Sequence, residues 1–486
     1  MDLIARIQHW GTTTPERIAH LSAGQTLTYG RLAHESDLLA GYLIQTLPDD
    51  SSPIAILGHK ENEMLIGFLG CVKAGHPYIP LDSSLPVQRV DTILHTAQIS
   101  LTLTPEIIRL IIPQASIIGE TRQPAHDDSW YIIFTSGSTG EPKGVVITRE
   151  CLESFVDWIL PEQGFKEGGE VFLNQAPFSF DLSVMDLYSS LASGGTLFSI
   201  TKDEIAELKT LYQTFAKSEI TVWVSTPSFA RLCLMDNSFN ESMLPQVRKF
   251  WFCGETLAPE VAAGLLKRFP KAEVWNTYGP TEATVATTSI RITEEVIAKY
   301  SPLPVGRAKP NSLVQVHDPD GRPVPDGERG EVIIAGENVS TGYIHRADLT
   351  SRAFFKINNY RAYRTGDSGH YADGWLFFDG RMDFQIKLAG YRIEIGDIEA
   401  NLHALENVQD AVVIPALKNE RADHLVAFVI LKQKTDDDFA TMKQMKQRLS
   451  ERLPEYMLPR RFIFLSEFPL TPNGKADRRK LAEKIE

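Results

Sequence analysis

The residues best suited to chemistry lie in a glycine-rich segment that follows a buried apolar run. From position 135 to position 144 it reads Thr-Ser-Gly-Ser-Thr-Gly-Glu-Pro-Lys-Gly. The glycines let the backbone approach an anion closely, and the hydroxyl and N–H groups can donate hydrogen bonds to phosphate oxygens. Lys143 adds a positive charge, although its place between a proline and a glycine differs from the Walker A loop. The order of these residues favours a phosphate-binding loop over an ordinary flexible surface loop.

The runs around this loop predict the elements that position it. Short apolar runs typical of buried strands alternate with amphipathic runs of helical spacing through the first half of the chain. We expect helices at 61–74 and 181–192. We expect strands at 53–57, 131–135, 171–174, 221–225, 249–253 and 272–276. Alternation at this spacing predicts an α/β fold whose sheets are largely parallel.

The pattern changes twice towards the C-terminus. From about 300 to 380, short strand signals are separated by Pro, Gly and Asp turns, which predicts a β-rich subdomain. After Asp383, strand and helix signals mix in a segment of roughly domain size. We therefore expect a large N-terminal domain at 1–382 and a small α+β domain at 383–486.

Composition and charge narrow the class of protein. The 486 residues are 43% hydrophobic and 23% charged, a balance typical of chains that fold around a core. No run of about 18 uncharged apolar residues occurs, so we expect no membrane span. The net charge of −13 argues against nucleic acid as a partner, because phosphate backbones attract basic surfaces. Four cysteines without metal-binding spacing, and an N-terminus without an apolar signal run, favour a cytoplasmic protein.

Five segments resemble, in the same order, those of the adenylate-forming enzymes, a family that includes acyl-CoA synthetases, luciferases and amino-acid adenylation domains. The segment at 135–144 is similar to the family's phosphate loop, and 276–282 (Asn-Thr-Tyr-Gly-Pro-Thr-Glu) to its adenine- and magnesium-contacting segment. The segment at 363–367 resembles its ribose-binding segment, 380–394 its hinge and following crossover, and 473–475 its C-terminal catalytic lysine. The resemblance covers nearly the whole chain and implies the adenylating fold, with a small mobile C-terminal domain.

The resemblance implies that the chain joins a carboxylate to ATP, releases pyrophosphate and leaves an acyl-adenylate. Lys475 would bridge the carboxylate and the α-phosphate, and Glu282 would be the ligand of Mg²⁺. Tyr278 would stack on adenine, Asp367 would accept the ribose hydroxyls, and Arg381 would reach the ribose or the phosphates. The expected ATP-binding residues are Thr135, Ser136, Gly137, Ser138, Thr139, Gly140, Lys143, Asn276, Thr277, Tyr278, Gly279, Pro280, Thr281, Asp367, Arg381 and Lys475.

Three residues point to the substrate. In amino-acid-activating members of the family, an aspartate at the position of Asp181 pairs with the substrate's ammonium; the alternative is a cap for the following helix. Segments such as 175–188 resemble the branch of ligases that activate D-alanine for a carrier protein. There, a cysteine at the position of Cys253 lines the side-chain pocket and is linked to the choice of the D enantiomer, and we expect Val285 beside it. The alternative for Cys253 is an ordinary buried thiol.

The resemblance also implies a second reaction. The D-alanyl group would pass to the phosphopantetheine thiol of a small D-alanyl carrier protein, for the D-alanylation of lipoteichoic acid. Because Lys475 and the thiol cannot occupy the site together, the C-terminal domain would turn about a hinge at Asp383. Two alternatives are activation of another small amino acid, such as L-alanine or glycine, and a non-catalytic adenylate-binding protein. The second would be expected to lack Lys475, Glu282 or Asp367, and the sequence contains all three.

Overall fold

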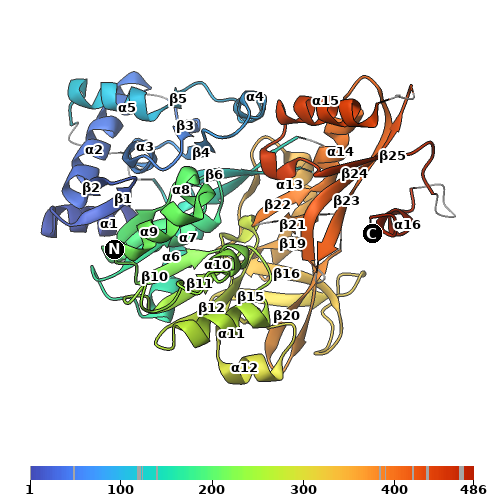
Figure 1. Ribbon diagram of the computed structural model, residues 1–486. Coiled ribbons are helices and arrows are strands. Elements are labelled where there is room, and N and C mark those ends of the chain that lie inside the picture. Colours follow the sequence, from blue (N-terminus) through green and yellow to red (C-terminus); the bar gives the residue numbers. More distant parts are fainter. Residues whose placement is uncertain are drawn as a thin grey trace. The chain divides into compact units, whose positions relative to one another are not determined.

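Figure 1 shows the computed structural model of the chain, which describes residues 2–47, 50–117, 122, 124–137, 141–382, 385–388, 390–418, 421–433, 437–469 and 476–485. Its contacts divide the chain into two units. The first comprises Met1–Ser83, Ala97–Phe134 and Gly144–Met382. The second comprises Ser84–Thr96, Thr135–Lys143 and Asp383–Glu486.

The larger sheet of the first unit has nine strands, of which the central ones run parallel. These central strands are almost entirely buried, which is why the sequence shows them as short continuous apolar runs. In spatial order the strands are β14 (Arg307–Ala308), β13 (Thr288–Ile292), β12 (Glu273–Tyr278), β11 (Lys249–Phe252), β10 (Val222–Ser225), β8 (Val171–Asn174), β9 (Thr196–Ser199), β1 (Ile18–Ser22) and β2 (Gln25–Thr28).

A second sheet has six strands and pairs parallel strands in its middle, where β4 lies between β3 and β6. Strand β6 leads into the glycine-rich loop, and β7 follows it. In spatial order the strands are β17 (Gly342–Tyr343), β7 (Lys143–Thr148), β6 (Ser129–Thr135), β4 (Tyr78–Asp82), β3 (Ile54–Gly58) and β5 (Thr102–Leu103).

The predicted β-rich subdomain is a five-stranded antiparallel sheet. Its long strand β19 pairs with three others, so that the residues of the predicted ribose segment lie inside the sheet rather than in a loop. The strands are β15 (Ser312–His317), β16 (Gly330–Gly336), β18 (Phe354–Ile357), β19 (Tyr360–Ala372) and β20 (Trp375–Arg381).

The helices of the first unit begin at the capping residues that the sequence offers. Thr28, Thr148 and Thr226 each accept a hydrogen bond from the helix that follows. The predicted helices at 61–74 and 181–192 correspond to α3 and α7. Among the described residues, no helix has the length and the apolar character needed to cross a membrane. The helices are α1 (Leu3–Thr13), α2 (Tyr29–Thr46), α3 (Asn62–Lys73), α5 (Pro105–Ile111), α6 (Arg149–Gln163), α7 (Leu182–Ser193), α8 (Lys202–Ala206), α9 (Leu208–Ala216), α10 (Pro227–Cys233), α11 (Pro259–Arg268), α12 (Glu294–Lys299) and α13 (Ala347–Ala353), with the 3₁₀ turns η1 (Ile112–Gln114) and η2 (Thr281–Ala283).

The second unit is α+β, as the sequence predicts, with its own core. Helices α14 and α15 and the strands β23 and β24 bury apolar side chains such as Ile398, Val413 and Leu449 together. The predicted hinge Asp383 lies outside the described residues, so the domain boundary placed there stays a prediction. The elements are α4 (Val87–Thr96), β21 (Gln385–Leu388), β22 (Tyr391–Glu394), α14 (Ile395–His403), β23 (Val408–Lys418), β24 (Arg421–Leu431), α15 (Asp438–Ser450), η3 (Glu455–Met457), β25 (Arg461–Phe464) and α16 (Arg478–Ala482).

Candidate active site

Several predicted site residues follow the carboxyl ends of neighbouring parallel strands. At this edge of a parallel sheet the loops converge, and ligands bind there. Strands β11 and β12 pair in parallel, and in their register Phe252 lies beside Asn276. Cys253 and Thr277 are the residues that follow these two in the chain. Strand β8 pairs with β10, and the chain leaving β8 leads to Asp181 at the start of α7. The sheet topology therefore places these segments at one edge.

Asp181 precedes α7 without capping it. Its side chain accepts no capping hydrogen bond, and its φ and ψ angles of −63° and −25° are helical. A capping aspartate has extended backbone angles and accepts a hydrogen bond from a backbone N–H of the first turn. The carboxylate is half-buried. The alternative that Asp181 caps the following helix is therefore wrong.

Tyr131 on β6 is a neighbour of Asp181 that sequence reasoning did not single out. Burial, and then the charge of Asp181, raise the pKa of the Tyr131 hydroxyl. This hydroxyl is buried and has no hydrogen-bond partner among the described residues. Buried polar atoms normally have partners, so an unpaired hydroxyl near a carboxylate is a candidate contact for a polar ligand.

Cys253 and Val285, both expected in the substrate pocket, are in contact. The Cys253 thiol donates to the carbonyl oxygen of Val285 over 3.4 Å, and both residues are buried. They belong to the same buried cluster as Phe178 and Leu182, which lie on either side of Asp181 in the chain. The structure thus brings the expected pocket residues together, while the part of Cys253 in choosing an enantiomer stays a prediction.

Val285 lies at the centre of a strained turn. The N–H of Ala286 donates to the carbonyl of Thr284 over 2.8 Å, and Val285 has a φ of 68°. A three-residue γ-turn with positive φ is rare, and a β-branched residue in this region is an outlier. Such a conformation costs about 1 to 3 kcal/mol and persists only where the surroundings hold it. A Cβ at Gly279 would lie 2.7 Å from the Cα of Ala286, so only glycine allows this close approach.

Asp367, the residue expected at the ribose, is held by two of its predicted neighbours. Nη1 of Arg381 lies 2.7 Å from Oδ1, and the hydroxyl of Tyr278 donates to Oδ2 over 2.6 Å. Strands β19 and β20 place Asp367 opposite Arg381. Burial and the charge of Asp367 raise the pKa of Tyr278, so its hydroxyl remains a donor. Each carboxylate oxygen keeps a lone pair for a ribose hydroxyl, because an ionised carboxylate has about four acceptor positions.

Asn276 and Thr277 hydrogen-bond to backbone carbonyls. Nδ2 of Asn276 donates to the carbonyl of Pro304 over 2.9 Å, and the Thr277 hydroxyl donates to that of Phe252 over 2.7 Å. These bonds position the segment that continues through Pro280. Contact of the two side chains with the nucleotide stays a prediction.

Glu282, the expected metal ligand, lies in the turn η2 next to Thr281 and is fully buried. The hydroxyl of Tyr343 donates to its Oε1 over 2.8 Å, which orients the carboxylate. The described part of the chain contains no group of three or more His, Cys, Asp or Glu side chains placed to hold a metal ion. Mg²⁺ commonly takes only one or two carboxylates and completes its shell with phosphate oxygens and water. A single oriented carboxylate beside a triphosphate therefore fits this ion.

The described residues of the glycine-rich loop from Thr135 to Lys143 belong to the second unit, and Gly144 belongs to the first. The N–H of Glu394 donates to Oγ of Ser136 over 3.0 Å, and Nζ of Lys143 lies 4.0 Å from Oε1 of Glu394. A Cβ at Gly137 would lie 2.0 Å from a carbonyl oxygen of the same loop, so this position requires glycine. Outside the described residues lie the predicted loop residues Ser138, Thr139 and Gly140, the catalytic Lys475 and the hinge Asp383.

A buried polar network holds the segment that leads to Asp181, and sequence reasoning missed it. Lys60 is 2% exposed, and its Nζ donates to Oδ1 of Asn174 and to the carbonyl of Ala176. Nδ2 of Asn174 donates to Oδ2 of Asp186 over 2.7 Å. Asp186 is only 1% exposed, so this carboxylate lies inside the core.

The charges of this network are strongly affected by burial. Burial lowers the pKa of Lys60 to about 7, although the nearby carboxylates of Asp186 and Asp82 oppose the shift. Burial raises the pKa of Asp186 to about 7, against the opposing charge of Lys60. A buried charge requires compensation, and here the two opposite charges attract each other while Asn174 hydrogen-bonds to both side chains.

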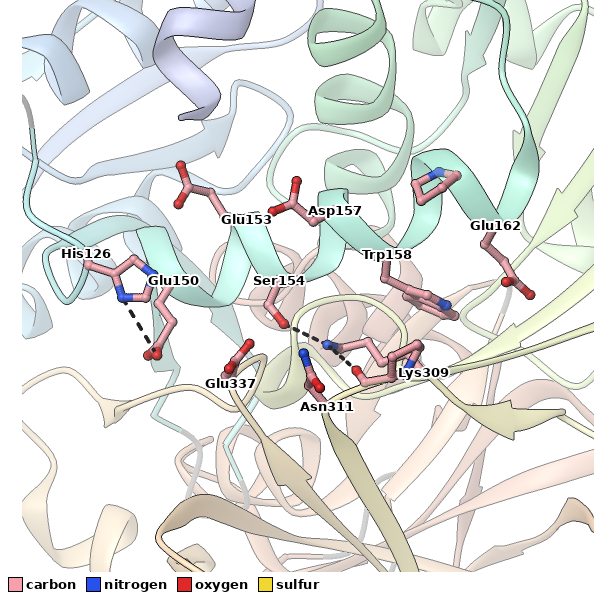
Figure 2. A pocket seen from close by; sticks show the side chains of 12 residues that line it. His126, Glu150, Glu153, Ser154, Asp157, Trp158, Glu162, Lys309, Asn311 and Glu337 are labelled. Carbon is pink, nitrogen blue, oxygen red and sulfur yellow. Dashed lines mark hydrogen bonds and ion pairs between the residues drawn. The ribbon is translucent and has the colours of Figure 1, made fainter. Parts of the chain in front are cut away.

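A pocket of about 490 Å³ beside α6 contains none of the predicted site residues. Figure 2 shows Lys309 directed at Ser154 on this helix, and Nζ donates to the Ser154 hydroxyl over 2.7 Å. Burial lowers the pKa of Lys309 to about 8. The pocket is unsuited to a polyanion such as ATP, because carboxylates dominate its lining. These carboxylates belong to Glu150, Glu153, Asp157, Glu162 and Glu337.

Comparison with known proteins defines the class to which this fold and site belong. The profile of the AMP-binding enzyme family matches residues 7–344, and that of the AMP-binding enzyme C-terminal domain matches residues 397–475. The chain therefore belongs to the AMP-binding enzymes. Within this family it falls among the D-alanine--D-alanyl carrier protein ligases. The ligases of Bacillus anthracis and of Bacillus thuringiensis (strain Al Hakam) are each 47% identical to it, over 100% of both chains.

Solved structures show the same fold at lower identity. An adenylation domain of Vibrio cholerae in complex with glycyl-adenosine-5'-phosphate has a TM-score of 0.85 at 23% identity, over 99% of this chain and 97% of that one. The o-succinylbenzoate CoA synthetase of Bacillus subtilis has a TM-score of 0.85 at 20% identity, over 98% of both chains. The predicted adenylating fold, with a large N-terminal α/β domain and a small C-terminal domain, is thus confirmed.

Proposed function

We propose that this chain activates D-alanine with ATP and transfers the D-alanyl group to the thiol of a carrier protein. Its full-length relatives, named D-alanine--D-alanyl carrier protein ligases, support this activity. The observation that carries the substrate class is the Asp181 carboxylate, which stands half-buried at the start of a buried helix without capping it. A carboxylate in this place suits the ammonium of an amino acid through a charge-assisted hydrogen bond.

In the first reaction a carboxylate oxygen of D-alanine attacks the α-phosphorus of ATP, and the bond to pyrophosphate breaks. Bringing an anion to a polyanion is an electrostatic problem, solved by positioned charges. Lys475 bridges the carboxylate and the α-phosphate, and Asp367 accepts the ribose hydroxyls while Tyr278 and Arg381 hold it in place. Glu282 would hold Mg²⁺, which when bound would supply positive charge to compensate that of the phosphates.

The pocket for the side chain distinguishes enantiomers by shape. A small amino acid fixed at its carboxylate and its ammonium presents its methyl group in different directions in the D and L forms. Cys253 and Val285 are in contact and buried, and they line the side of the pocket that accepts the methyl group of D-alanine. Misplacement of a single methyl group in an apolar pocket is worth about 1 to 3 kcal/mol.

In the second reaction the phosphopantetheine thiol of the carrier attacks the carbonyl carbon of D-alanyl-AMP. The sulfur loses its proton to solvent, AMP leaves, and a thioester forms. Because Lys475 and the thiol need the same space, the C-terminal domain turns about Asp383 between the two reactions. The D-alanyl thioester is the donor for the D-alanylation of lipoteichoic acid. The enzyme acts in the cytoplasm, where ATP is present.

A pyrophosphate-exchange panel with D-alanine, L-alanine, glycine and D-serine tests this function. We expect ATP- and Mg²⁺-dependent exchange with the highest kcat/KM for D-alanine. The variant Asp181→Asn should lower kcat/KM for D-alanine by about 10- to 100-fold, because a charge-assisted hydrogen bond of about 1.5 to 3 kcal/mol is lost. A higher kcat/KM for L-alanine or glycine than for D-alanine would make that amino acid the assigned substrate. Exchange with none of the four amino acids would overturn the activity.

A further inference from the structure

Asn338 contacts the strained turn at Val285 from both ends. It is fully buried in the chain that follows β16. Its Nδ2 donates to the carbonyl of Ala283 and to the hydroxyl of Thr287, each over 2.9 Å. The hydroxyl of Thr284 donates to the backbone carbonyl of Asn338 over 2.8 Å. One residue of another segment therefore binds three of the residues that surround Val285.

The orientation of the Asn338 amide is determined by its partners. The carbonyl of Ala283 can only accept a hydrogen bond, so the NH₂ side of the amide must face the turn. On its other side, the hydroxyl of Ser312 on β15 donates to Oδ1 over 2.7 Å. The amide thus connects β15 to both ends of residues 283–287, and none of its described polar atoms is left unpaired.

We propose that Asn338 is a positioning residue for the choice between D- and L-alanine. Its two donated hydrogen bonds keep residues 283–287 in the strained conformation, which places the carbonyl of Val285 against the thiol of Cys253. This inference rests on the proposed function, in which Cys253 and Val285 line the methyl pocket. Without the amide, Val285 relaxes from its φ of 68° towards negative φ, because this region is unfavourable for a β-branched residue. The carbonyl of Val285 then moves away from Cys253, and the shape of the pocket no longer distinguishes D-alanine from L-alanine.

The ratio of kcat/KM for D-alanine to that for L-alanine is the decisive measurement. Changes in stability or in ATP binding affect both substrates alike and cancel in this ratio. The variant Asn338→Leu has a similar shape but donates no hydrogen bond, and we expect it to lower the ratio by about tenfold or more. Thr287→Val removes only one partner of the amide with little change in shape, and we expect a decrease of about threefold.

Thr288→Val provides a matched control. Thr288 is the next residue and is equally buried, but its hydroxyl donates to the carbonyl of Val305 over 2.5 Å and not to Asn338. We expect its ratio to stay within about twofold of the wild type. If Asn338→Leu does not fold, the ratio measured for Thr287→Val decides whether Asn338 has this positioning role.

The outcomes separate this inference from the proposed function. A ratio that changes in Asn338→Leu and Thr287→Val, but not in Thr288→Val, supports the positioning role. A wild-type ratio in the variants that fold, with D-alanine exchange intact, overturns the role of Asn338 and leaves the proposed function standing. A wild-type protein that activates neither enantiomer overturns both.

Discussion

Replacing Lys60 by methionine tests the buried pair that the sequence did not reveal. Met keeps the length of the side chain but removes the ammonium that donates to Asn174 and Ala176 and faces Asp186. Lys60 and Asp186 are opposite buried charges joined through Asn174, and removing one of two compensating buried charges typically costs about 3 kcal/mol or more. We therefore expect Lys60→Met to lower the free energy of unfolding by about 3 kcal/mol at pH 7.

The size of this loss should depend on pH, and its sign follows from the shifted pKa values. The pKa of Lys60 is about 7 when folded, against 10.5 for a free lysine, so between these values the unfolded chain binds more protons. The stability of the wild type therefore rises with pH in this window, by about 1.4 kcal/mol per pH unit at most. Asp186 without Lys60 has its pKa raised further, which makes the variant less stable as pH rises. The difference between wild type and variant should thus grow by about 3 kcal/mol from pH 7 to pH 9.

Urea unfolding followed by tryptophan fluorescence measures the difference in free energy of unfolding between wild type and Lys60→Met in the first unit, which contains Lys60. All 7 tryptophans lie between Trp10 and Trp375, within the first unit. The exposed Lys356 on β18 gives the control variant Lys356→Met, whose difference from the wild type should not vary with pH. Coincident fluorescence and circular dichroism transitions would establish two-state unfolding of this unit. A Lys60→Met difference that is constant between pH 7 and pH 9 would refute the argument that burial shifts the pKa of Lys60.

Three further substitutions test the assigned roles. Lys475→Ala should reduce D-alanine-dependent pyrophosphate exchange by about 100-fold or more with an unchanged melting temperature, and normal exchange would exclude the lysine from the first reaction. Asp367→Asn should raise the KM for ATP by about tenfold or more while changing the KM for D-alanine less, and the reverse pattern would contradict a ribose-binding carboxylate. Cys253→Ala should change the D/L ratio of kcat/KM by about tenfold, and an equal ratio would leave the thiol as an ordinary core residue.

The sequence predicted the fold class because its signals are local. The central strands β8, β10 and β11 are short, mostly apolar runs, and several helices of this unit begin at Thr or Pro residues that cap or start helices. The segments at 135–144 and 276–282 could also be recognised, since the residues that give each loop its chemistry are consecutive in the sequence. Position 279 illustrates this: a glycine in the sequence proved necessary where Ala286 approaches the backbone.

The sequence did not predict the role of a residue where that role depends on a partner that is distant in the chain. No pattern in the sequence marks Asp186 as buried, because the link from Lys60 through Asn174 to Asp186 forms only when β8 and α7 pack against the segment after β3. Asp181 had two interpretations from the sequence, and only its backbone angles and the absent capping bond exclude that of a helix cap. No sequence pattern marks Asn338, which is remote in the chain from the turn that it binds.

By itself, the sequence determined the class of the protein and the consecutive segments predicted to contact the nucleotide, because hydrophobic patterning and loop chemistry act between near neighbours in the chain. The tertiary structure alone decided which buried polar groups hydrogen-bond to one another, that Asp181 does not cap α7, and what holds the strained turn at Val285. The physical reason is that burial makes unpaired polar groups costly, and their partners come from strands and loops that meet only in the assembled sheets.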